Sequence, residues 1–202
     1  MRDSAAVVFV VDDDASVRAA LSSLIRSIGL NVVLFATTVE FLSFPRSDVP
    51  SCLVLDVRLP GRSGLDLQQD LRISGENIPV IFITGHGDIP MSVRAMKAGA
   101  VEFILKPFRE QELLDAIVLA LDRDAAARSR RVEIAGIRKA LATLSGRELQ
   151  VMDGLLAGML NKQVAAVLGV SEVTVKLHRR RLLQKMSVSS LVLLARLVER
   201  IH

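Results

Sequence analysis

The sequence predicts an α/β domain with a doubly wound parallel sheet, followed by a small all-α domain of four short helices. Three observations support this division. Short apolar runs alternate with helical periodicity five times between residue 7 and about residue 121. After Leu144 helical periodicity continues without strand-like runs, and the balance of charge reverses near residue 122. Five successive βα units form a parallel sheet that is covered by helices on both faces.

The five expected strands are short, mainly apolar runs. They are Val7 to Val11, Asn31 to Phe35, Cys52 to Asp56, Pro79 to Ile83 and Val101 to Leu105. Segments with helical periodicity lie between them. The first carries Val17, Leu21, Leu24, Ile25 and Ile28 on one face, and Gly29 is suited to end that helix.

The pattern changes after the fifth βα unit. Residues 123–141 hold helix formers and charges but little apolar face, which predicts a solvated helical linker. Four short helices are expected beyond it, with breaks near Gly158, Gly169 and Ser187. We therefore expect a first domain over residues 1–122, a linker over 123–141 and a second domain over 142–202.

Charge separates the two expected domains more sharply than the net value of +4 suggests. Residues 1–122 hold 11 Lys and Arg against 16 Asp and Glu, a net charge of −5. Residues 123–202 hold 15 against 6, a net charge of +9. A small basic domain suits a polyanionic partner, because phosphate contacts supply most non-specific affinity for nucleic acid. A basic face that is merely solvated remains the alternative at this point.

Cysteine content and apolar runs limit the class of protein. A single cysteine, Cys52, excludes an internal disulfide and argues against a metal site built from cysteines, so a buried structural thiol is expected. The N-terminal apolar run Val7–Val11 is too short for a signal peptide or a membrane span. These features predict a cytoplasmic protein with no membrane partner.

Polar residues that can carry chemistry stand at the carboxyl ends of the expected strands. Asp12 and Asp13 follow the first strand, Asp56 ends the third, Thr84 follows the fourth and Lys106 follows the fifth. Ligands of doubly wound sheets bind beyond these strand ends, so the five residues should converge. Three neighbouring carboxylates repel one another unless a cation neutralises them, and an all-oxygen set suits Mg²⁺.

Phosphoryl transfer to a carboxylate uses such a set of groups. Asp56 would be the nucleophile, and Mg²⁺ and the Lys106 ammonium would stabilise charge on the transferring oxygens. Thr84 would hydrogen-bond the product phosphate. Taken singly, each residue has a simpler explanation, since Asp at a strand end often caps a helix. The joint pattern is difficult to explain by capping.

A helix-turn-helix is predicted in the C-terminal part. Gln163–Leu168 forms a short helix, Gly169–Val170 a tight turn, and Ser171 an N-cap for the next helix. On that second helix one side is apolar, with Val175, Leu182 and Met186. A different face carries Val173, Lys176, Leu177 and Arg180, which would reach a major groove. An amphipathic surface helix is the alternative that periodicity alone leaves open.

The N-terminal motifs resemble a receiver domain of the flavodoxin-like (βα)5 type. They are Val10-Val11-Asp12-Asp13-Asp14, Asp56-Val57-Arg58-Leu59-Pro60-Gly61 and Lys106-Pro107-Phe108, and the stretch from Ile83 to Met91 resembles the FixJ branch. The resemblance implies a sensor histidine kinase as phosphoryl donor to Asp56. It implies Mg²⁺ ligation by Asp13, the Asp56 carboxylate and the Arg58 carbonyl, with Asp12 acting through water.

The same resemblance assigns a switch to Thr84 and Phe103. The Thr84 hydroxyl is drawn to the phosphate in this family, and the aromatic ring at the position of Phe103 follows inward. Plain core packing of Phe103 is an equally good explanation from sequence alone. His86 lies in a loop and is expected to be a conformational or solvated residue instead of a ligand.

The C-terminal motifs resemble a LuxR-type DNA-binding domain. They are Leu144-Ser145-Gly146-Arg147-Glu148, Asn161-Lys162-Gln163-Val164-Ala165 and Thr174-Val175-Lys176-Leu177-His178-Arg179. The resemblance places Lys176, Leu177 and Arg180 at base-facing positions. It makes Thr174, Arg179 and Lys162 phosphate contacts, and it gives His178 a structural role. The chain departs from the family at Leu160, where a small polar residue is common, and at Ser187, where Gly or Asn often ends the helix.

Together the two resemblances identify the chain as a two-component response regulator of the NarL/FixJ family. They imply a transcription regulator, not an enzyme, that binds promoter DNA as a phosphorylation-promoted homodimer and activates transcription through RNA polymerase. A haloacid dehalogenase-type phosphatase is disfavoured, because Arg58 stands where that family needs a second Asp. A protein-interaction module with a basic end remains the third possibility.

Overall fold

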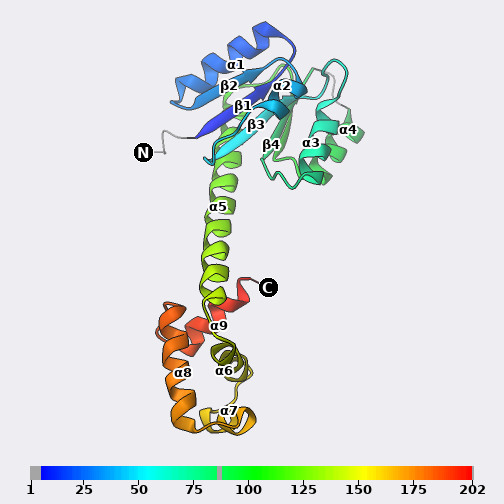
Figure 1. Ribbon diagram of the computed structural model, residues 1–202. Helices are drawn as coiled ribbons and strands as arrows, with labels where there is room; N and C mark the ends of the chain where they lie inside the picture. The colour runs from blue at the N-terminus through cyan, green and yellow to red at the C-terminus, as the bar shows by residue number, and fades with distance from the viewer. Residues whose placement is uncertain (1–5, 86–87, 202) are drawn as a thin grey trace. The chain divides into compact units, whose positions relative to one another are not determined.

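The computed structural model describes residues 6–85 and 88–201. The chain divides into two compact units, Met1–Arg128 and Ser129–His202, each with its own core. His86 lies outside the described residues. Figure 1 shows the helices and strands of both units.

The N-terminal unit contains a five-stranded parallel sheet of order β2-β1-β3-β4-β5. The strands are β1 (Val7–Val11), β2 (Asn31–Phe35), β3 (Ser51–Asp56), β4 (Val80–Thr84) and β5 (Glu102–Leu105). The predicted parallel α/β fold is confirmed. Three of the five strands differ from the sequence-based ranges by one residue at one or both ends, and Thr84 is therefore the last residue of β4 instead of the first residue beyond it.

Five helices belong wholly or partly to this unit. They are α1 (Ala15–Ser27), α2 (Thr38–Ser43), α3 (Gly64–Ile73), α4 (Ile89–Lys97) and α5 (Glu110–Ala142). Side chains of α1 and α5 pack with Val8 and Val10 on one face of the sheet. Side chains of α2, α3 and α4 pack with Phe9 and Val11 on the other. Successive strand residues point to opposite faces, so these strands are apolar without alternation.

The central strand β3 is buried along its whole length. Cys52 lies in it with no exposed surface, which confirms the expected buried thiol. Burial raises the pKa of this thiol, and the carboxylate of Asp124 raises it further. A thiol in this setting stays protonated and unreactive.

Helix α5 extends from the N-terminal unit into the C-terminal one. Residues 123–141, expected as a helical linker, are its continuation. The expectation of solvation fails at Asp124, which is 2% exposed. Its Oδ2 accepts hydrogen bonds from the Ser51 N–H at 2.8 Å and from Arg128 Nε at 2.6 Å. Ile137, further along, packs in the C-terminal core.

The C-terminal unit holds four short helices after α5, and its described residues form no strand, as predicted. They are α6 (Gly146–Leu156), α7 (Asn161–Leu168), α8 (Glu172–Lys185) and α9 (Leu191–Glu199). Their core contains Leu182, Met186 and Leu194 with Ile137 of α5. Within the described part of the chain, no helix is both long and apolar enough to traverse a lipid bilayer.

The start of α3 passes very close to the end of β3. The Gly64 N–H donates to the Val57 carbonyl at 2.9 Å. A Cβ atom at Gly64 would stand 2.3 Å from the Asp56 carbonyl oxygen and 3.0 Å from Leu55 Cγ. Glycine is therefore required here by space, next to the residue expected to react.

We predict that Gly64→Ala destabilises the N-terminal unit by about 1 to 3 kcal/mol, because the added methyl group must displace backbone. Urea unfolding followed by circular dichroism measures the change. Gly146→Ala is the matched control, since a Cβ at Gly146 meets nothing within 4 Å. Equal stability of the two variants would contradict the close approach.

Candidate functional site

Three carboxylates meet at the carboxyl ends of two neighbouring strands. Asp12 and Asp13 directly follow β1, and Asp56 ends β3, which pairs with β1. One carboxylate oxygen from each residue lies within 4.8 Å of the other two. Asp12 has no exposed surface and Asp56 is 8% exposed, whereas Asp13 is exposed. The structure therefore brings together the three carboxylates that the strand positions indicated.

Lys106 bridges two of these carboxylates. Its Nζ donates to Asp12 Oδ2 at 2.7 Å and to Asp56 Oδ2 at 3.0 Å. The backbone fixes its position, because the Lys106 N–H donates to the Thr84 carbonyl at 2.8 Å. Thr84 is 1% exposed at the end of β4, the strand between those of Asp56 and Lys106. Thr84 and Lys106 thus belong to the same site as the acidic cluster.

Backbone N–H groups hold the remaining oxygens of the buried carboxylates. Asp12 Oδ1 accepts from the Asp14 N–H at 2.9 Å, and Asp56 Oδ1 accepts from the Arg58 N–H at 3.0 Å. Arg58 therefore turns its main chain toward the site while its side chain is exposed. These bonds fix the two buried carboxylates, while Asp13 presents its oxygens to solvent.

Burial and ion pairing shift the pKa values in this cluster. Burial raises the pKa of Asp12, although hydrogen bonds from Lys106 and from the Asp14 N–H oppose the increase. Burial alone would lower the pKa of Lys106, but its hydrogen bonds to Asp12 and Asp56 outweigh that effect and raise it. Lys106 therefore remains an ammonium at neutral pH.

The charges of the ionised cluster do not balance. Three carboxylates face one ammonium, which leaves an excess of two negative charges. A divalent cation with a preference for oxygen ligands would supply the missing charge, and the exposed carboxylate of Asp13 beside the buried ones would give it access. The donor set therefore fits a hard divalent metal ion.

Phe103 lies on β5 beside this site. It is half-buried, pairs in register with Phe82 of β4, and its ring centroid is 6.1 Å from that of Phe82. Two residues further along the same pair of strands, Thr84 stands opposite Leu105. The ring is therefore a neighbour of Thr84 on the adjacent strand and also a member of the core on the α3 and α4 face.

The C-terminal unit contains the predicted helix-turn-helix. Helix α7 begins at Asn161, two residues earlier than expected, and ends at Leu168; its C-cap residue Gly169 has a left-handed φ of 65°. Ser171 caps α8 by accepting from the Thr174 N–H at 3.1 Å. Glycine suits the turn because it adopts this φ without strain.

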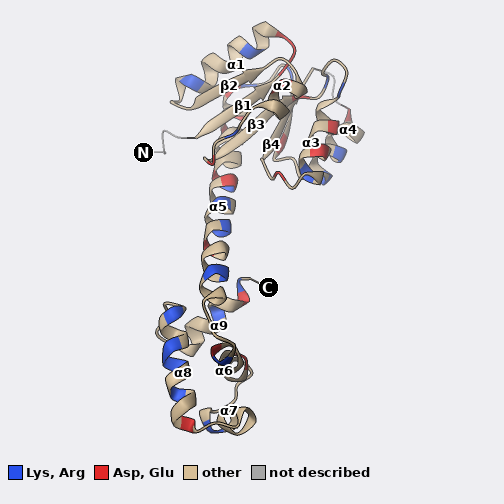
Figure 2. Ribbon diagram, in the orientation of Figure 1, with Lys and Arg blue, Asp and Glu red and all other residues tan. Residues whose placement is uncertain are grey.

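Helix α8 separates a buried side from a basic side. Val175, Leu182 and Met186 are buried as predicted, at 0%, 0% and 3% exposure. Among the expected DNA contacts, Lys176, Leu177 and Arg180 are exposed, and so is Lys162 on α7, whereas Thr174 and Arg179 are half-buried. Figure 2 shows the basic residues spread along α8. Lys176 also pairs with Glu172, one turn earlier, at 2.9 Å.

A shallow depression of about 550 Å³ lies between the basic side of α8 and the start of α7. Lys176, Arg179, Arg180 and Asn161 all line it. The Asn161 Oδ1 is buried and has no hydrogen-bond partner among the described residues. Asn161 was not singled out from the sequence, although it lies inside one of the motifs that carry the resemblance.

Glu148 anchors the far end of α8. Its carboxylate accepts from the Ser145 N–H at 2.8 Å and from Lys185 Nζ at 2.7 Å, and Lys185 also donates to the Thr143 carbonyl at 2.9 Å. The hydrogen bond from Lys185, followed by that from the Ser145 N–H, lowers the pKa of Glu148 to about 2. Glu148 and Lys185 thus fix α8 to α6.

Two positions that depart from the family pattern show how the backbone accommodates them. Leu160 precedes α7 without a capping side chain, and its N–H donates instead to Gln163 Oε1 at 2.7 Å. Ser187 ends the α8 region with a φ of 54°, the left-handed conformation that Gly or Asn adopts more easily. His178 is half-buried, and its Nδ1 is enclosed without a partner in the described part of the chain.

Comparisons with known proteins agree with both halves of this description. Residues 8–118 match the model of the response regulator receiver domain, and residues 142–198 match that of bacterial regulatory proteins of the luxR family. Nodulation protein W of Bradyrhizobium diazoefficiens is 54% identical over 96% of this chain and 86% of its own length. Transcriptional regulatory protein FixJ of the same organism is 38% identical over 96% and 94%. The response regulator StyR, solved at low resolution, superposes with a TM-score of 0.88 at 50% identity, covering 96% of this chain and 98% of StyR.

The Glu148 ion pair leads to a pH-dependent prediction. A carboxylate whose pKa is lowered on folding stabilises the protein above its unfolded-state pKa, and this contribution disappears as the pH falls through the folded-state value. For Glu148 the window runs from 4.5 down to about 2. We predict that Glu148→Gln costs on the order of 1 to 3 kcal/mol at neutral pH, and that the difference from wild type shrinks across this window.

Urea unfolding of both proteins at a series of pH values measures this difference. Glu199→Gln is the control, because Glu199 is an exposed carboxylate on the neighbouring α9. Stability curves of wild type and Glu148→Gln that stay parallel from pH 5 to pH 2 would show that the Lys185 pair contributes nothing.

Proposed function

Because the chain belongs to the NarL/FixJ family of response regulators, transcription regulators with a receiver domain and a LuxR-type DNA-binding domain, we propose that phosphorylation of Asp56 controls its binding to promoter DNA. A sensor histidine kinase would donate the phosphoryl group. One observation carries this proposal: the Asp56 carboxylate lies in a three-carboxylate cluster and is bonded to the Lys106 ammonium.

The geometry suits phosphoryl transfer. An Asp56 carboxylate oxygen attacks the phosphorus of a phosphohistidine, the new P–O bond forms, and the N–P bond to the imidazole breaks. Lys106 stands where its ammonium neutralises charge on the transferred oxygens, and the buried Asp12 carboxylate holds it there. Thr84 lies at the end of β4, between the strands of Asp56 and Lys106, and would donate its hydroxyl to the product phosphate.

Mg²⁺ fits the same cluster. Asp13, the Asp56 carboxylate and the Arg58 carbonyl would bind the ion directly, and Asp12 would act through water. The exposure of Asp13 and the enclosure of Asp12 by Lys106 and the Asp14 N–H support this division. The bound ion would neutralise phosphoryl oxygens and align them with Asp56.

A conformational response would begin at Thr84. Its movement toward the phosphate would leave space beside β4, and the half-buried ring of Phe103 would turn inward to fill it. The contact between Phe103 and Phe82 supports such a rearrangement, because it places the ring at the boundary between core and solvent. A phosphorylation-promoted homodimer would then bind paired half-sites and activate RNA polymerase.

The exposed side of α8 would read DNA. Lys176, Leu177 and Arg180 would face base edges in the major groove, and Thr174, Arg179 and Lys162 would contact phosphates. The exposure of Lys176 and Arg180 supports base contact, and the half-buried position of Arg179 supports a contact at the edge of the groove. Lys176 would exchange its bond with Glu172 for one with DNA.

We predict that acetyl phosphate with Mg²⁺ labels the full-length protein on Asp56. Asp56→Asn should abolish the label because it removes the nucleophilic oxygen, and Asp13→Ala should weaken Mg²⁺ binding because it removes a direct ligand. Mass spectrometry locates the label, and sedimentation of the labelled protein should show the mass of a dimer.

Asp122→Asn is the control for this experiment, because Asp122 is an exposed carboxylate of the same unit outside the cluster. It should be labelled like the wild type. Undiminished label on Asp56→Asn would overturn the assignment of the phosphoacceptor, and a labelled monomer would overturn the proposed dimer.

The basic residues of α8 should differ in what they contribute to DNA binding, because some would contact bases and others phosphates. Lys176→Ala and Arg180→Ala should each cost about 1 to 3 kcal/mol at a cognate site and relax the base preference. Arg179→Ala should weaken binding to specific and to non-specific DNA equally. It should also reduce the slope of log Kobs against log salt concentration by about one unit. Binding across a salt series, on the cognate site and on single-base variants, separates these results. An unchanged base preference in the first two variants would mean that another element reads the sequence.

A further inference from the structure

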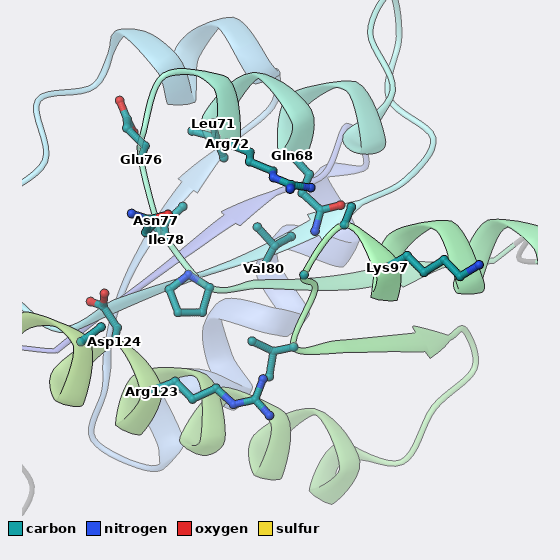
Figure 3. A pocket seen from close by; sticks show the side chains of 15 residues that line it. Gln68, Leu71, Arg72, Glu76, Asn77, Ile78, Val80, Lys97, Arg123 and Asp124 are labelled. Atoms are coloured by element: carbon teal, nitrogen blue, oxygen red, sulfur yellow. The ribbon is translucent and has the colours of Figure 1, made fainter. Parts of the chain in front are cut away.

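A cavity of about 480 Å³ opens at the end of the sheet opposite Asp56. Val80, the first residue of β4, and Val101, which precedes β5, form its floor. Because all strands are parallel, their amino ends lie at the edge away from the acidic cluster. Residues of α3, of the end of α4 and of α5 form the walls (Figure 3). The cavity is therefore separate from the site described above.

A buried amide in the cavity wall lacks a partner. Gln68 of α3 is 6% exposed, and its Oε1 is enclosed with no hydrogen bond to any described residue. Figure 3 shows its side chain leaving α3 toward the cavity. A buried polar atom without a partner costs free energy, and native proteins rarely leave one unless a ligand or water completes it. Gln68 therefore points to a ligand with a hydrogen-bond donor, or with an acceptor if the amide is turned.

The charged residues of the wall are unevenly paired. Arg72, Lys97 and Arg123 come from α3, α4 and α5, and none has an ion pair within residues 6–85 and 88–201. The two acidic wall residues are engaged elsewhere, Glu76 with Arg46 and Asp124 with Ser51 and Arg128.

This leaves an excess of positive charge at the opening. In Figure 3 the Arg72 guanidinium lies near the Gln68 amide and that of Arg123 lies along α5 below the floor, while Lys97 extends away along the surface. A second hollow of about 580 Å³ adjoins the first through Gln68, Arg72 and Lys97, and it adds Arg94. An anion is the complementary ligand, and Arg suits carboxylate or phosphate because its planar group donates in pairs.

Apart from Asn77, the rest of the lining is apolar. Leu71, Ile78, Pro79, Val80 and Val101 all contribute to it. A cavity of this volume, in which apolar residues lie beside polar and charged groups, has room for a small molecule with an apolar body and a charged group. We propose that this cavity binds a small organic anion, with its apolar body on the floor and its carboxylate or phosphate group at Arg72 beside the Gln68 amide, while Arg123 contributes positive charge from the opposite wall.

A ligand bound in this cavity would contact α5, the helix that the two units share. Arg123 and Asp124 are consecutive residues of α5, and Asp124 accepts from the Ser51 N–H at the start of β3, whose other end is Asp56. A ligand in the cavity would lie between α3 on one face of the sheet and α5 on the other, and so would link the two helices at this edge. The inference rests on the cavity alone and does not depend on phosphorylation of Asp56.

Methyl NMR of the full-length protein tests the proposal with three probes of one shape. Benzoate, phenyl phosphate and neutral benzamide share an aromatic ring, whose ring current shifts nearby methyl signals. Benzoate or phenyl phosphate should shift the methyl groups of Leu71, Ile78, Val80 and Val101 in a saturable manner, with Kd on the order of millimolar for probes of this size. The stronger of the two identifies the preferred anionic group. Equal binding of benzamide, or no shift of these methyl groups with either anion, would overturn the proposal.

Matched variants locate the contact. Arg72→Gln should raise the Kd of the anionic probe about three- to tenfold, since it removes a charge-assisted contact at a partly exposed rim, and Arg123→Gln should raise it by a smaller factor, since it removes a more distant positive charge. Gln68→Leu should weaken binding of the probe. It should leave the methyl signals of residues near the acidic cluster unchanged. Arg130→Gln is the control, because Arg130 is exposed on the same helix outside the cavity lining. Wild-type affinity in both arginine variants would place the probe elsewhere and refute the site.

Discussion

The N-terminal unit depends on the position of one ammonium group between two buried carboxylates. Without Lys106, Asp12 and Asp56 would face each other at the end of adjacent strands with no compensating charge, and burial of such a pair is costly. With Lys106 in place the cluster still carries more negative than positive charge. The arrangement that lets the fold bury these carboxylates therefore also suits the divalent cation and the phosphoryl group that we propose for this site. In that proposal, the same three side chains determine both the stability and the reactivity of the site.

The central strand β3 connects this cluster with the helix that the two units share. Asp56 stands at its carboxyl end, and the Ser51 N–H at its amino end is bonded to Asp124 of α5. Every residue of the strand is buried, so neither end can shift without disturbing the packing on both faces of the sheet. Gly64 adds a further constraint, because α3 begins directly against the Asp56 carbonyl. The proposed phosphoacceptor carboxylate thus lies where the backbone is tightly held, and the proposed conformational response involves the side chains of Thr84 and Phe103.

The fold and the acidic cluster followed from the sequence because their signals are local. Continuous apolar runs mark strands that are buried on both faces, and polar residues at their ends mark one edge of a parallel sheet. Asp124 and Glu148 could not be placed in this way. Each looks like an ordinary charge on a helix, and the partners that explain their burial lie far away in the chain, Ser51 for Asp124 and Lys185 for Glu148. Gln68 and Asn161 gave no signal either, since an unpaired buried amide is defined only by what surrounds it.

The basic residues of α8 fall into two groups. One fixes the helix to the rest of the C-terminal unit, and the other is exposed. Lys185 is bonded to Glu148 and to the Thr143 carbonyl, and Val175 and Leu182 are fully buried, so one side and one end of the helix are committed to the fold. Lys176 and Arg180 are exposed, and the salt bridge from Lys176 to Glu172 is one that solvent weakens and DNA phosphate or base can replace. When buried contacts fix a helix, its exposed side chains lose less conformational entropy on binding. This favours specific binding over non-specific electrostatic binding. The buried ion pair of Glu148 and Lys185 therefore stabilises the fold, whereas the exposed pair of Glu172 and Lys176 lies on the surface that we propose for DNA binding.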